Sequence, residues 1–301
     1  MSGAPNEGEL GRGVLGRVAL FGSLIKFSHS IFAAPFALAM FAVVARDRVV
    51  TFSQLLWIAL ALVAARSAAM GWNRWLDRSI DAKNPRTAGR EIPRGAIPPA
   101  TVLILTLLSA AVFVGAAAAL GSHCLLLSPL VLGVLFLYSW TKRFTSYSHL
   151  VLGLCLAMAP GGVWYAVTAE FAILPVFMMV GVLLWVAGFD ILYACQDLQF
   201  DRAAGLYSIP ARFGAVNAFR IARVLHLCSW LFLVGFGAAA GLSYAYFIGV
   251  LVFGWALLSQ HRLVTPSDLT QMTAAFFTRN GIASCAFFLG TVADFLLLRF
   301  G

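Results

Sequence analysis

The chain has 301 residues, of which 61% are apolar and 11% are charged, and its mean hydropathy is +0.89. A soluble domain carries about 25% charged residues, so a water-soluble globule and a disordered chain are excluded. The formal net charge of +9 indicates the orientation of a membrane protein, not binding of nucleic acid. The composition therefore predicts a helical protein that crosses the lipid bilayer many times.

The first segment, residues 1–17, is a polar, Gly-rich tail without a small-residue cleavage site, so we expect no removed signal peptide. We predict that residues 18–301 form a single transmembrane domain. A helical span needs about 20 apolar residues. The chain offers nine such runs, at 18–44, 51–76, 100–120, 124–141, 147–168, 171–195, 216–240, 243–260 and 276–299. The predicted fold is all-α, with about nine transmembrane helices.

The positive charges are distributed unevenly between the two ends of these spans. If the N-terminus lies inside, fifteen Lys and Arg residues fall on the inner side and three on the outer side. Lys and Arg bias sets orientation, so we expect a multi-pass protein of the cell's inner (plasma) membrane with a cytoplasmic N-terminus. Asp294, near the outer end of the last run, is expected to be a solvated charge.

Acidic residues gather at two inner connections, 77–99 and 196–215. The chain has only twelve acidic residues, and six of them lie in or beside these connections: Asp77, Asp81, Glu91, Asp190, Asp197 and Asp201. Ionisable residues at membrane depth are costly and usually mark function. Asn73 precedes Asp77 by four residues and Arg66 precedes Asn73 by seven, so at about 100° per residue these positions share one helix face.

The two acidic stretches resemble each other. Each is followed by Ala-Gly and then by Ile-Pro with a nearby Arg and Gly. Four positions recur with a displacement of 120 residues: Ser28-His29, Asp77 and Asp81 reappear as Ser148-His149, Asp197 and Asp201. We infer an internal duplication of four-helix units, with a ninth helix added. Two related halves would bring their acidic helix ends together around one central cavity.

Paired carboxylates at i and i+4 are hard oxygen ligands that suit Mg²⁺. This ion typically binds through one or two carboxylates together with substrate phosphates and waters. Neighbouring Lys and Arg residues would hold the remaining diphosphate oxygens. The alternative is that the acids are solvated loop charges paired with nearby Arg. Two related pairs in a chain this poor in acids favour the metal–diphosphate interpretation.

Several motifs resemble those of the UbiA superfamily of intramembrane aromatic prenyltransferases. NRWLDRSID with NPRTAGREIPRG, and DILYACQDLQFDRAAGLYSIPARFG, are similar to the family's two signatures at 73–95 and 190–214. YSWTK and KFSH, at 138–142 and 26–29, match two shorter elements. The branch it resembles is that of the 4-hydroxybenzoate polyprenyltransferases, including enzymes of the futalosine route to menaquinone. Many family members carry Asp where this chain has Arg74, so no metal role is implied there.

The resemblance implies Mg²⁺-dependent transfer of a polyprenyl group from a polyprenyl diphosphate to a phenolic acid. The acceptor would be 4-hydroxybenzoate or a dihydroxynaphthoate, in ubiquinone or menaquinone biosynthesis. The implied metal ligands are Asn73, Asp77, Asp81, Asp197 and Asp201. The four aspartates also count as catalytic, together with Tyr138 and Lys142, which would contact the leaving diphosphate. The predicted substrate-binding residues are Asn73, Lys26, Asp190, Arg66, Arg78 and Arg143. The three arginines are candidate partners of the acceptor carboxylate: the resemblance favours Arg78 and Arg143, and depth in the membrane alone favours Arg66.

Other interpretations stay open at this point. Lys26 is equally suited to snorkel to the interface, and His29 and His149 equally suit ordinary hydrogen-bonded helix positions. A CDP-alcohol phosphotransferase would carry the motif DGxxAR, and this motif does not occur in the chain. A transporter would carry its intramembrane acids near the midplane. Within the superfamily, haem O synthase, chlorophyll synthase and archaeal lipid enzymes fit the loop sequences less well.

Overall fold

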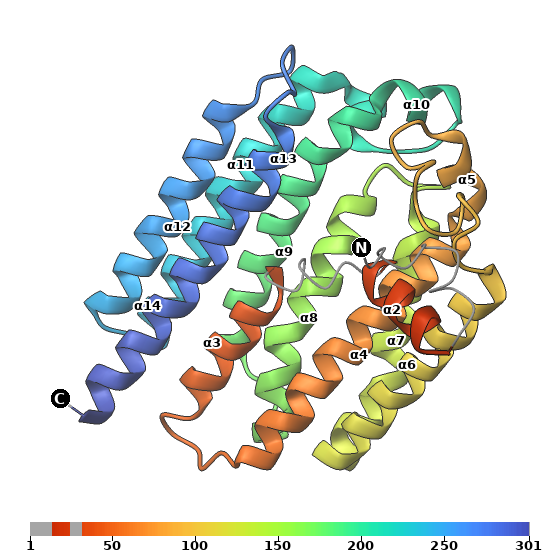
Figure 1. The fold of residues 1–301 in the computed structure, drawn as a ribbon. Coiled ribbons are helices and arrows are strands. Elements are labelled where there is room, and N and C mark those ends of the chain that lie inside the picture. The colour runs from red at the N-terminus through yellow and green to blue at the C-terminus, as the bar shows by residue number, and fades with distance from the viewer. Residues whose placement is uncertain (1–13, 25–31, 301) are drawn as a thin grey trace, which may run out of the picture. The chain divides into compact units, whose positions relative to one another are not determined.

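The computed structural model describes residues 14–24 and 32–300, and most of these residues form helices (Figure 1). Within this part of the chain, eight helical segments are long and apolar enough to cross a membrane. They are built on α4 (Phe52–Leu76), α6 (Pro99–Leu120), α7 (Ser122–Thr141), α8 (Ser148–Thr168), α9 (Ile173–Ala194), α11 (Ile209–Ala239), α12 (Tyr244–Leu263) and α14 (Asn280–Phe300). The predicted all-α, polytopic membrane fold is confirmed.

The first predicted span, 18–44, overlaps two shorter described helices. These are α2 (Val14–Leu24) and α3 (Ala34–Val44), each of 11 residues. Pro35 lies in the first turn of α3, where its missing N–H removes no intrahelical bond. The other predicted spans each correspond to one long helix. The chain divides into two compact units: residues 1–30 with 56–139, and residues 31–55 with 140–301. The prediction of a single domain over 18–301 stays a prediction.

The first unit holds α2, α6 and most of α4 and α7. Its core includes Phe21 and Leu24 of α2 and Val102 of α6, which pack with Met70 of α4. Gly71 allows α4 to approach α6 closely, since a Cβ there would lie 2.2 Å from the side-chain oxygen of Thr106. The close approach lies six residues before Asp77, the first aspartate after α4.

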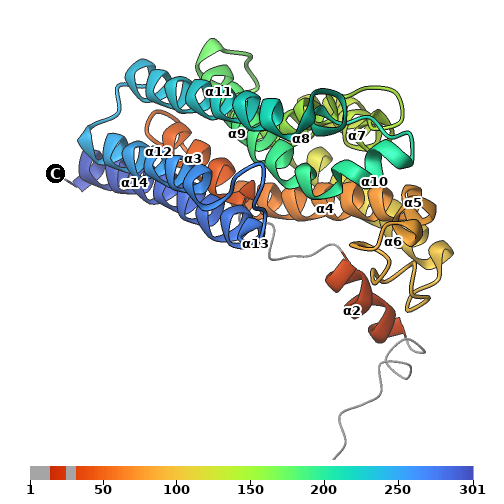
Figure 2. The ribbon, with the colours of Figure 1, turned by 90° about the horizontal axis from the view of Figure 1, so that it is seen from above.

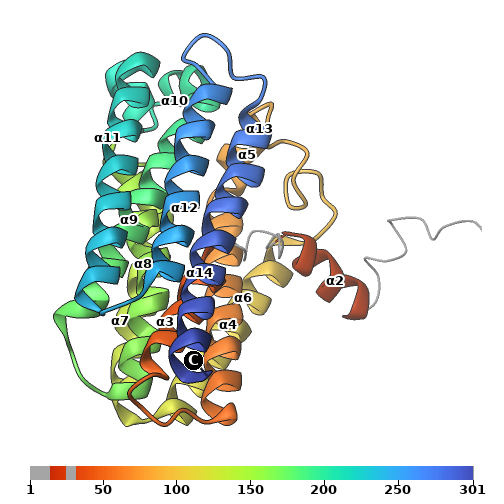
Figure 3. The same ribbon diagram turned by 90° about the vertical axis from the view of Figure 1, so that its left-hand side faces the viewer.

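The second unit is built around α9. This helix packs against α8 and α11, while α12 packs against α14 (Figures 2 and 3). Trp185 of α9 is fully buried and its ring lies 5.1 Å from that of Phe36 and 5.8 Å from that of Phe253. Its indole N–H donates to Asn280 Oδ1 at 2.9 Å. Because these rings come from α3, α9 and α12, they lock three helices together.

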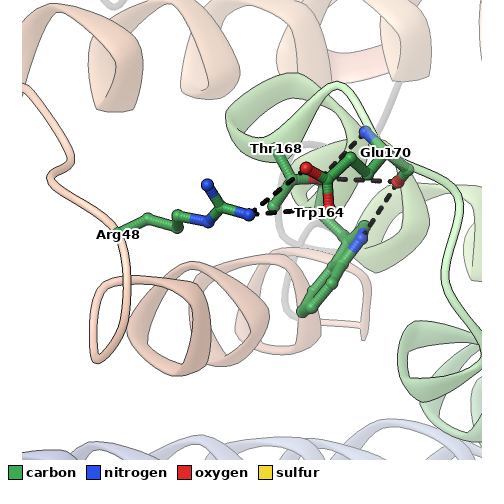
Figure 4. A network of polar contacts seen from close by, with 4 residues as sticks. All are labelled: Arg48, Trp164, Thr168 and Glu170. Atoms are coloured by element: carbon green, nitrogen blue, oxygen red, sulfur yellow. Dashed lines mark hydrogen bonds and ion pairs between the residues drawn. The ribbon is translucent and has the colours of Figure 1, made fainter.

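The second unit holds a charged pair at the surface and a buried carboxylate. Arg48 and Glu170 form an ion pair of 3.3 Å at the surface, beside Trp164 and Thr168 (Figure 4). Asp294 is instead fully buried and accepts a hydrogen bond from the backbone N–H of Ser243, at the start of α12. The expectation of a solvated Asp294 is therefore wrong, because one carboxylate oxygen accepts the backbone N–H of Ser243, the N-cap of α12, where a helix N-terminus favours a negative charge.

Candidate functional site

Both aspartate pairs lie where a long helix gives way to a short one. Asp77 follows α4 and precedes α5 (Arg78–Lys83), and Asp197 precedes α10 (Leu198–Ala203). Both short helices have six residues, and the two aspartates have similar backbone angles, φ −88° and ψ 2° at Asp77 and φ −97° and ψ 2° at Asp197. The same local structure in both repeats supports the inferred duplication.

This break changes the expected arrangement of each motif. We expected Asn73, Asp77 and Asp81 to lie on one face of a continuous helix. The structure ends α4 at Leu76, and in the second motif a 3₁₀ turn, η2 (Cys195–Asp197), follows α9. The backbone N–H of Asp81 still donates to the carbonyl of Asp77 at 2.8 Å. The turn is therefore bent and not unwound, so the paired carboxylates remain one turn apart.

The first carboxylate of the first motif is held by an amide. Asn73 Nδ2 donates to Asp77 Oδ2 at 3.1 Å and to the hydroxyl of Ser139 at 3.3 Å. Asp77 is 1% exposed. Since the amide nitrogen is used in these bonds, the carbonyl oxygen of Asn73 is the atom suited to a metal.

The second carboxylate is held by a guanidinium from the following loop. Arg90 Nη1 lies 2.7 Å from both carboxylate oxygens of Asp81. The side chains are 25% and 6% exposed respectively. Thr87 Oγ1 also donates to the backbone carbonyl of Asp81 at 3.0 Å. These contacts hold the loop after α5 against Asp81. The Arg90 guanidinium thus lies at the carboxylate oxygens that a metal ion would need.

The arginines near the first motif differ in their surroundings. Arg78 is exposed, donates to the carbonyl of Trp75 at 2.7 Å and stacks over its ring at 4.8 Å. Arg66 is partly buried two turns earlier on α4. Arg74 is buried, and its Nε has no hydrogen-bond partner. Asp81, Glu91 and Asp77 all lie within electrostatic reach of Arg74, so this arginine adds positive charge to the acidic helix end.

The second motif is connected to the helix that follows it. Ser208 is the N-cap of α11 and accepts a hydrogen bond from the N–H of Ala211 at 3.2 Å. Its hydroxyl donates to Asp201 Oδ2 at 2.9 Å. Lys142 lies in the turn after α7, and its backbone carbonyl accepts from the N–H of Tyr207 at 2.8 Å. The lysine and the aspartate are thus tied to the same connecting segment.

His149, whose role the sequence left open, contacts the second motif. His149 Nδ1 lies 2.6 Å from Asp190 Oδ2, and its Nε2 accepts from the N–H of Ile209 at 3.3 Å. The contact of His149 with Asp190 crosses from α8 to α9. Its only signal in the sequence was the recurrence of Ser-His in both repeats.

The remaining predicted residues have simpler outcomes. Tyr138 is half-buried near the end of α7, and Arg143 lies over the ring of Trp140 at 5.7 Å. Lys26 and His29 lie outside the described residues. Nothing in the structure assigns a role to any predicted site residue, so these roles stay predictions.

The chemistry of the donor set suits a hard divalent cation. Both motifs offer carboxylate oxygens, and the first adds an amide oxygen. Mg²⁺ prefers such oxygen ligands and completes its shell with water and phosphate. Within residues 14–24 and 32–300, no three His, Cys, Asp or Glu side chains lie close enough together to form a metal centre by themselves.

The fold is shared with solved membrane proteins. The apo structure of a UbiA homologue from Aeropyrum pernix K1 matches with a TM-score of 0.81 and 28% identity, over 89% of this chain and 98% of that one. A UbiA homologue from Archaeoglobus fulgidus, bound to GPP and Mg²⁺, matches with a TM-score of 0.71 and 16% identity, over 92% and 99%. The chain therefore has the architecture of this class of polytopic, all-α membrane protein.

The sequence places the chain within a family. The profile of the UbiA prenyltransferase family matches residues 33–288. A 4-hydroxybenzoate octaprenyltransferase from Aeromonas salmonicida is 30% identical over 80% of this chain and 84% of its own length. A protein of the same name from Escherichia fergusonii is 27% identical over 80% and 83%. The chain belongs to the UbiA prenyltransferase family, and it is a multi-pass membrane enzyme that transfers prenyl groups.

Proposed function

We propose that this enzyme transfers a polyprenyl group from a polyprenyl diphosphate to an aromatic acid, 4-hydroxybenzoate or a dihydroxynaphthoate, in quinone biosynthesis. The observation that carries the proposal is the repeated aspartate pair at two equivalent helix breaks. The relatives named 4-hydroxybenzoate octaprenyltransferase support the aromatic acid as acceptor. The alternatives are the acceptors of other UbiA-type enzymes.

We propose that Mg²⁺ binds at the aspartate motifs. Its proposed ligands are Asn73, Asp77, Asp81, Asp197 and Asp201. The ion, when bound, would neutralise the diphosphate and favour its departure. The Mg²⁺ in the Archaeoglobus fulgidus homologue belongs to that protein, and the donor set of this chain is what supports the ion here.

The protein's own cations complete the proposed diphosphate site. Lys142 carries three N–H donors and no acceptor, and Tyr138 carries a hydroxyl that can donate to the same oxygens. Lys26 is a further candidate. Donors aimed at the leaving oxygens bind more strongly as charge develops on them, so they lower the barrier more than they stabilise bound substrate.

The proposed reaction breaks the C1–O bond of the allylic diphosphate, and the bonding pair leaves with the diphosphate. The allylic carbon then bonds to the ring carbon ortho to the phenolic hydroxyl, and that ring carbon loses its proton. The acceptor carboxylate needs a cation in a low-dielectric site. Arg66, Arg78 and Arg143 are the candidates. The burial of Arg66 favours it, since a guanidinium shielded from water binds a carboxylate more strongly.

The test is product analysis with purified protein. Phenolic acids, their carboxylate-free analogues and a polyprenyl diphosphate are incubated with and without Mg²⁺, and products are identified by mass spectrometry. We expect one prenylated aromatic acid that forms only with Mg²⁺ and is absent with Asp197→Asn. Prenylation of a non-aromatic acceptor, or equal rates with the carboxylate-free analogues, would refute the aromatic-acid assignment.

We also propose that the N-terminus and the loop at 82–95 face the cytoplasm. The excess of Lys and Arg on that side of the predicted spans, fifteen against three, supports this orientation. The aspartate motifs would then lie on the cytoplasmic side of the membrane.

A further inference from the structure

His149 uses both of its ring nitrogens. It lies in the first turn of α8 and is 3% exposed. Nδ1 is 2.6 Å from a carboxylate oxygen of Asp190, and Nε2 is 3.3 Å from the backbone nitrogen of Ile209. A buried imidazole with a partner on each side cannot rotate without losing both bonds.

These two partners determine which nitrogen carries the proton. A backbone N–H is only a donor, so Nε2 of His149 must be the acceptor in its contact with Ile209. The proton of the neutral ring is therefore on Nδ1, and it is donated to the carboxylate of Asp190. Free imidazole has no such constraint, so the contacts of this ring set its tautomer.

The segment that follows the second aspartate motif is held at three successive residues. The N–H of Tyr207 donates to the carbonyl of Lys142, the hydroxyl of Ser208 donates to Asp201, and the N–H of Ile209 donates to His149. His149 thus supplies the last of three attachments and also reaches back to α9. The side chain of His149 therefore links Asp190 on α9 to the start of α11.

The side chain of Asp190 is partly exposed in this arrangement. Its contact with His149 uses Oδ2, and the side chain is 23% exposed. An ionised carboxylate is only an acceptor. The imidazole N–H uses Oδ2 and restrains the carboxylate, and a carboxylate has a second oxygen that can accept a hydrogen bond from a hydroxyl group.

We propose that His149 is a positioning residue that orients Asp190 toward the phenolic hydroxyl of the acceptor. The proposal rests on the proposed function, because it assigns the hydroxyl group to an aromatic acceptor. Asp190 is the residue that touches substrate, and His149 acts through it. The prenyl diphosphate does not depend on this contact.

The decisive variants differ in hydrogen bonding and keep a planar side chain. His149→Phe keeps a ring but removes the donor and the acceptor, and His149→Gln restores one of each. Loss of a hydrogen bond to a charged group reduces kcat/KM for the acceptor roughly 10- to 100-fold. We expect this loss with Phe, an unchanged KM for the prenyl diphosphate, and recovery of most of the activity with Gln. His123→Phe, on α7, is the matched control and should be active.

A double-mutant cycle tests whether the effect passes through Asp190. In an Asp190→Asn background, His149→Phe should cause little further loss for the acceptor, because residues that act as a unit are not additive. Additive losses would show that His149 acts independently of Asp190. Equal losses for both substrates, or failure of Gln to rescue, would show that the histidine only supports the fold. Either result overturns the proposal.

The tautomer gives a readout that does not depend on turnover. The chain has five histidines, so the imidazole ¹⁵N signals of His149 can be assigned by difference with His149→Phe. We expect a protonated Nδ1 and an unprotonated Nε2. A proton on Nε2 would refute the contact with Ile209. If the wild type prenylates no aromatic acid but shows the expected tautomer, the proposed function fails while the His149–Asp190 link stands.

Discussion

Arg90 and Asp81 offer a direct test of how the first motif holds its charge. The pair is short, at 2.7 Å, and the carboxylate side chain is 6% exposed. Arg90→Gln removes the positive charge and leaves a buried carboxylate with a neutral neighbour. Removing one partner of a buried ion pair costs about 3–5 kcal/mol. Because Arg90 is 25% exposed, water screens part of its interaction with Asp81, and we expect the free energy of unfolding to fall by about 2–3 kcal/mol.

The assay is thermal unfolding in detergent. A change of 1 kcal/mol shifts the midpoint by about 2–4 °C in chains of a few hundred residues, so we expect a fall of at least about 4 °C in the absence of metal. The chain offers a matched control in Arg48→Gln. Its partner Glu170 is 3.3 Å away, and the two side chains are 52% and 62% exposed. Exposed pairs contribute about 0–1 kcal/mol, so this variant should unfold close to wild type.

Mg²⁺ extends the same experiment to the proposed metal site. Arg90 occupies both oxygens of Asp81, so it competes with a cation for that carboxylate. We expect Mg²⁺ with pyrophosphate to stabilise Arg90→Gln more than it stabilises wild type, by mass action on the folded state. Equal stabilisation of both proteins, or an Arg90→Gln midpoint equal to that of Arg48→Gln, would refute this reasoning.

Four further predictions concern other residues. Asp77→Asn and Asp197→Asn should each abolish turnover at limiting Mg²⁺ and still unfold near wild type, because each removes an anionic ligand without changing volume; near-normal activity in either contradicts the metal role. Lys142→Ala should lower kcat or raise KM for the prenyl diphosphate; unchanged kinetics with lower expression would make it only an orientation anchor. Gly214 has φ 80° and ψ 162° inside α11, a conformation that only Gly adopts easily, so Gly214→Ala should cost about 1–3 kcal/mol; an unchanged unfolding midpoint would show that the kink relaxes. A cysteine replacing Gly89 in a Cys-free background should react with an impermeant thiol reagent only after cell lysis; labelling of intact cells would invert the orientation.

Apolar runs and residue spacing predicted most of the fold and identified both motifs. A run of about 20 apolar residues has few structural options in a bilayer, so the positions of α6, α8 and α12 follow from composition. The same runs predicted tight connections near 121–123 and 169–170, and the structure has them at 121 and 169–172. The repeated spacing predicted equivalent aspartate pairs, and the dihedral angles at Asp77 and Asp197 agree with it.

Contacts between distant segments could not be predicted in this way. The pairing of His149 with Asp190 spans 41 residues and depends on how α8 packs against α9. The burial of Asp294 depends on the start of α12 lying beside α14. Hydropathy and periodicity describe one helix at a time, so they do not identify which polar group meets which across a helix interface. The expected central cavity between the two repeats stays a prediction for the same reason.

Pyrophosphate binding tests most directly the central prediction, namely that each aspartate motif is needed for Mg²⁺-dependent binding of diphosphate. Binding of inorganic pyrophosphate to purified wild type, Asp77→Asn and Asp197→Asn is measured by calorimetry with and without Mg²⁺. We expect wild type to bind one pyrophosphate per chain only when Mg²⁺ is present, and each single variant to lose that binding. Mg²⁺-dependent binding that persists with full stoichiometry in either variant would contradict the prediction.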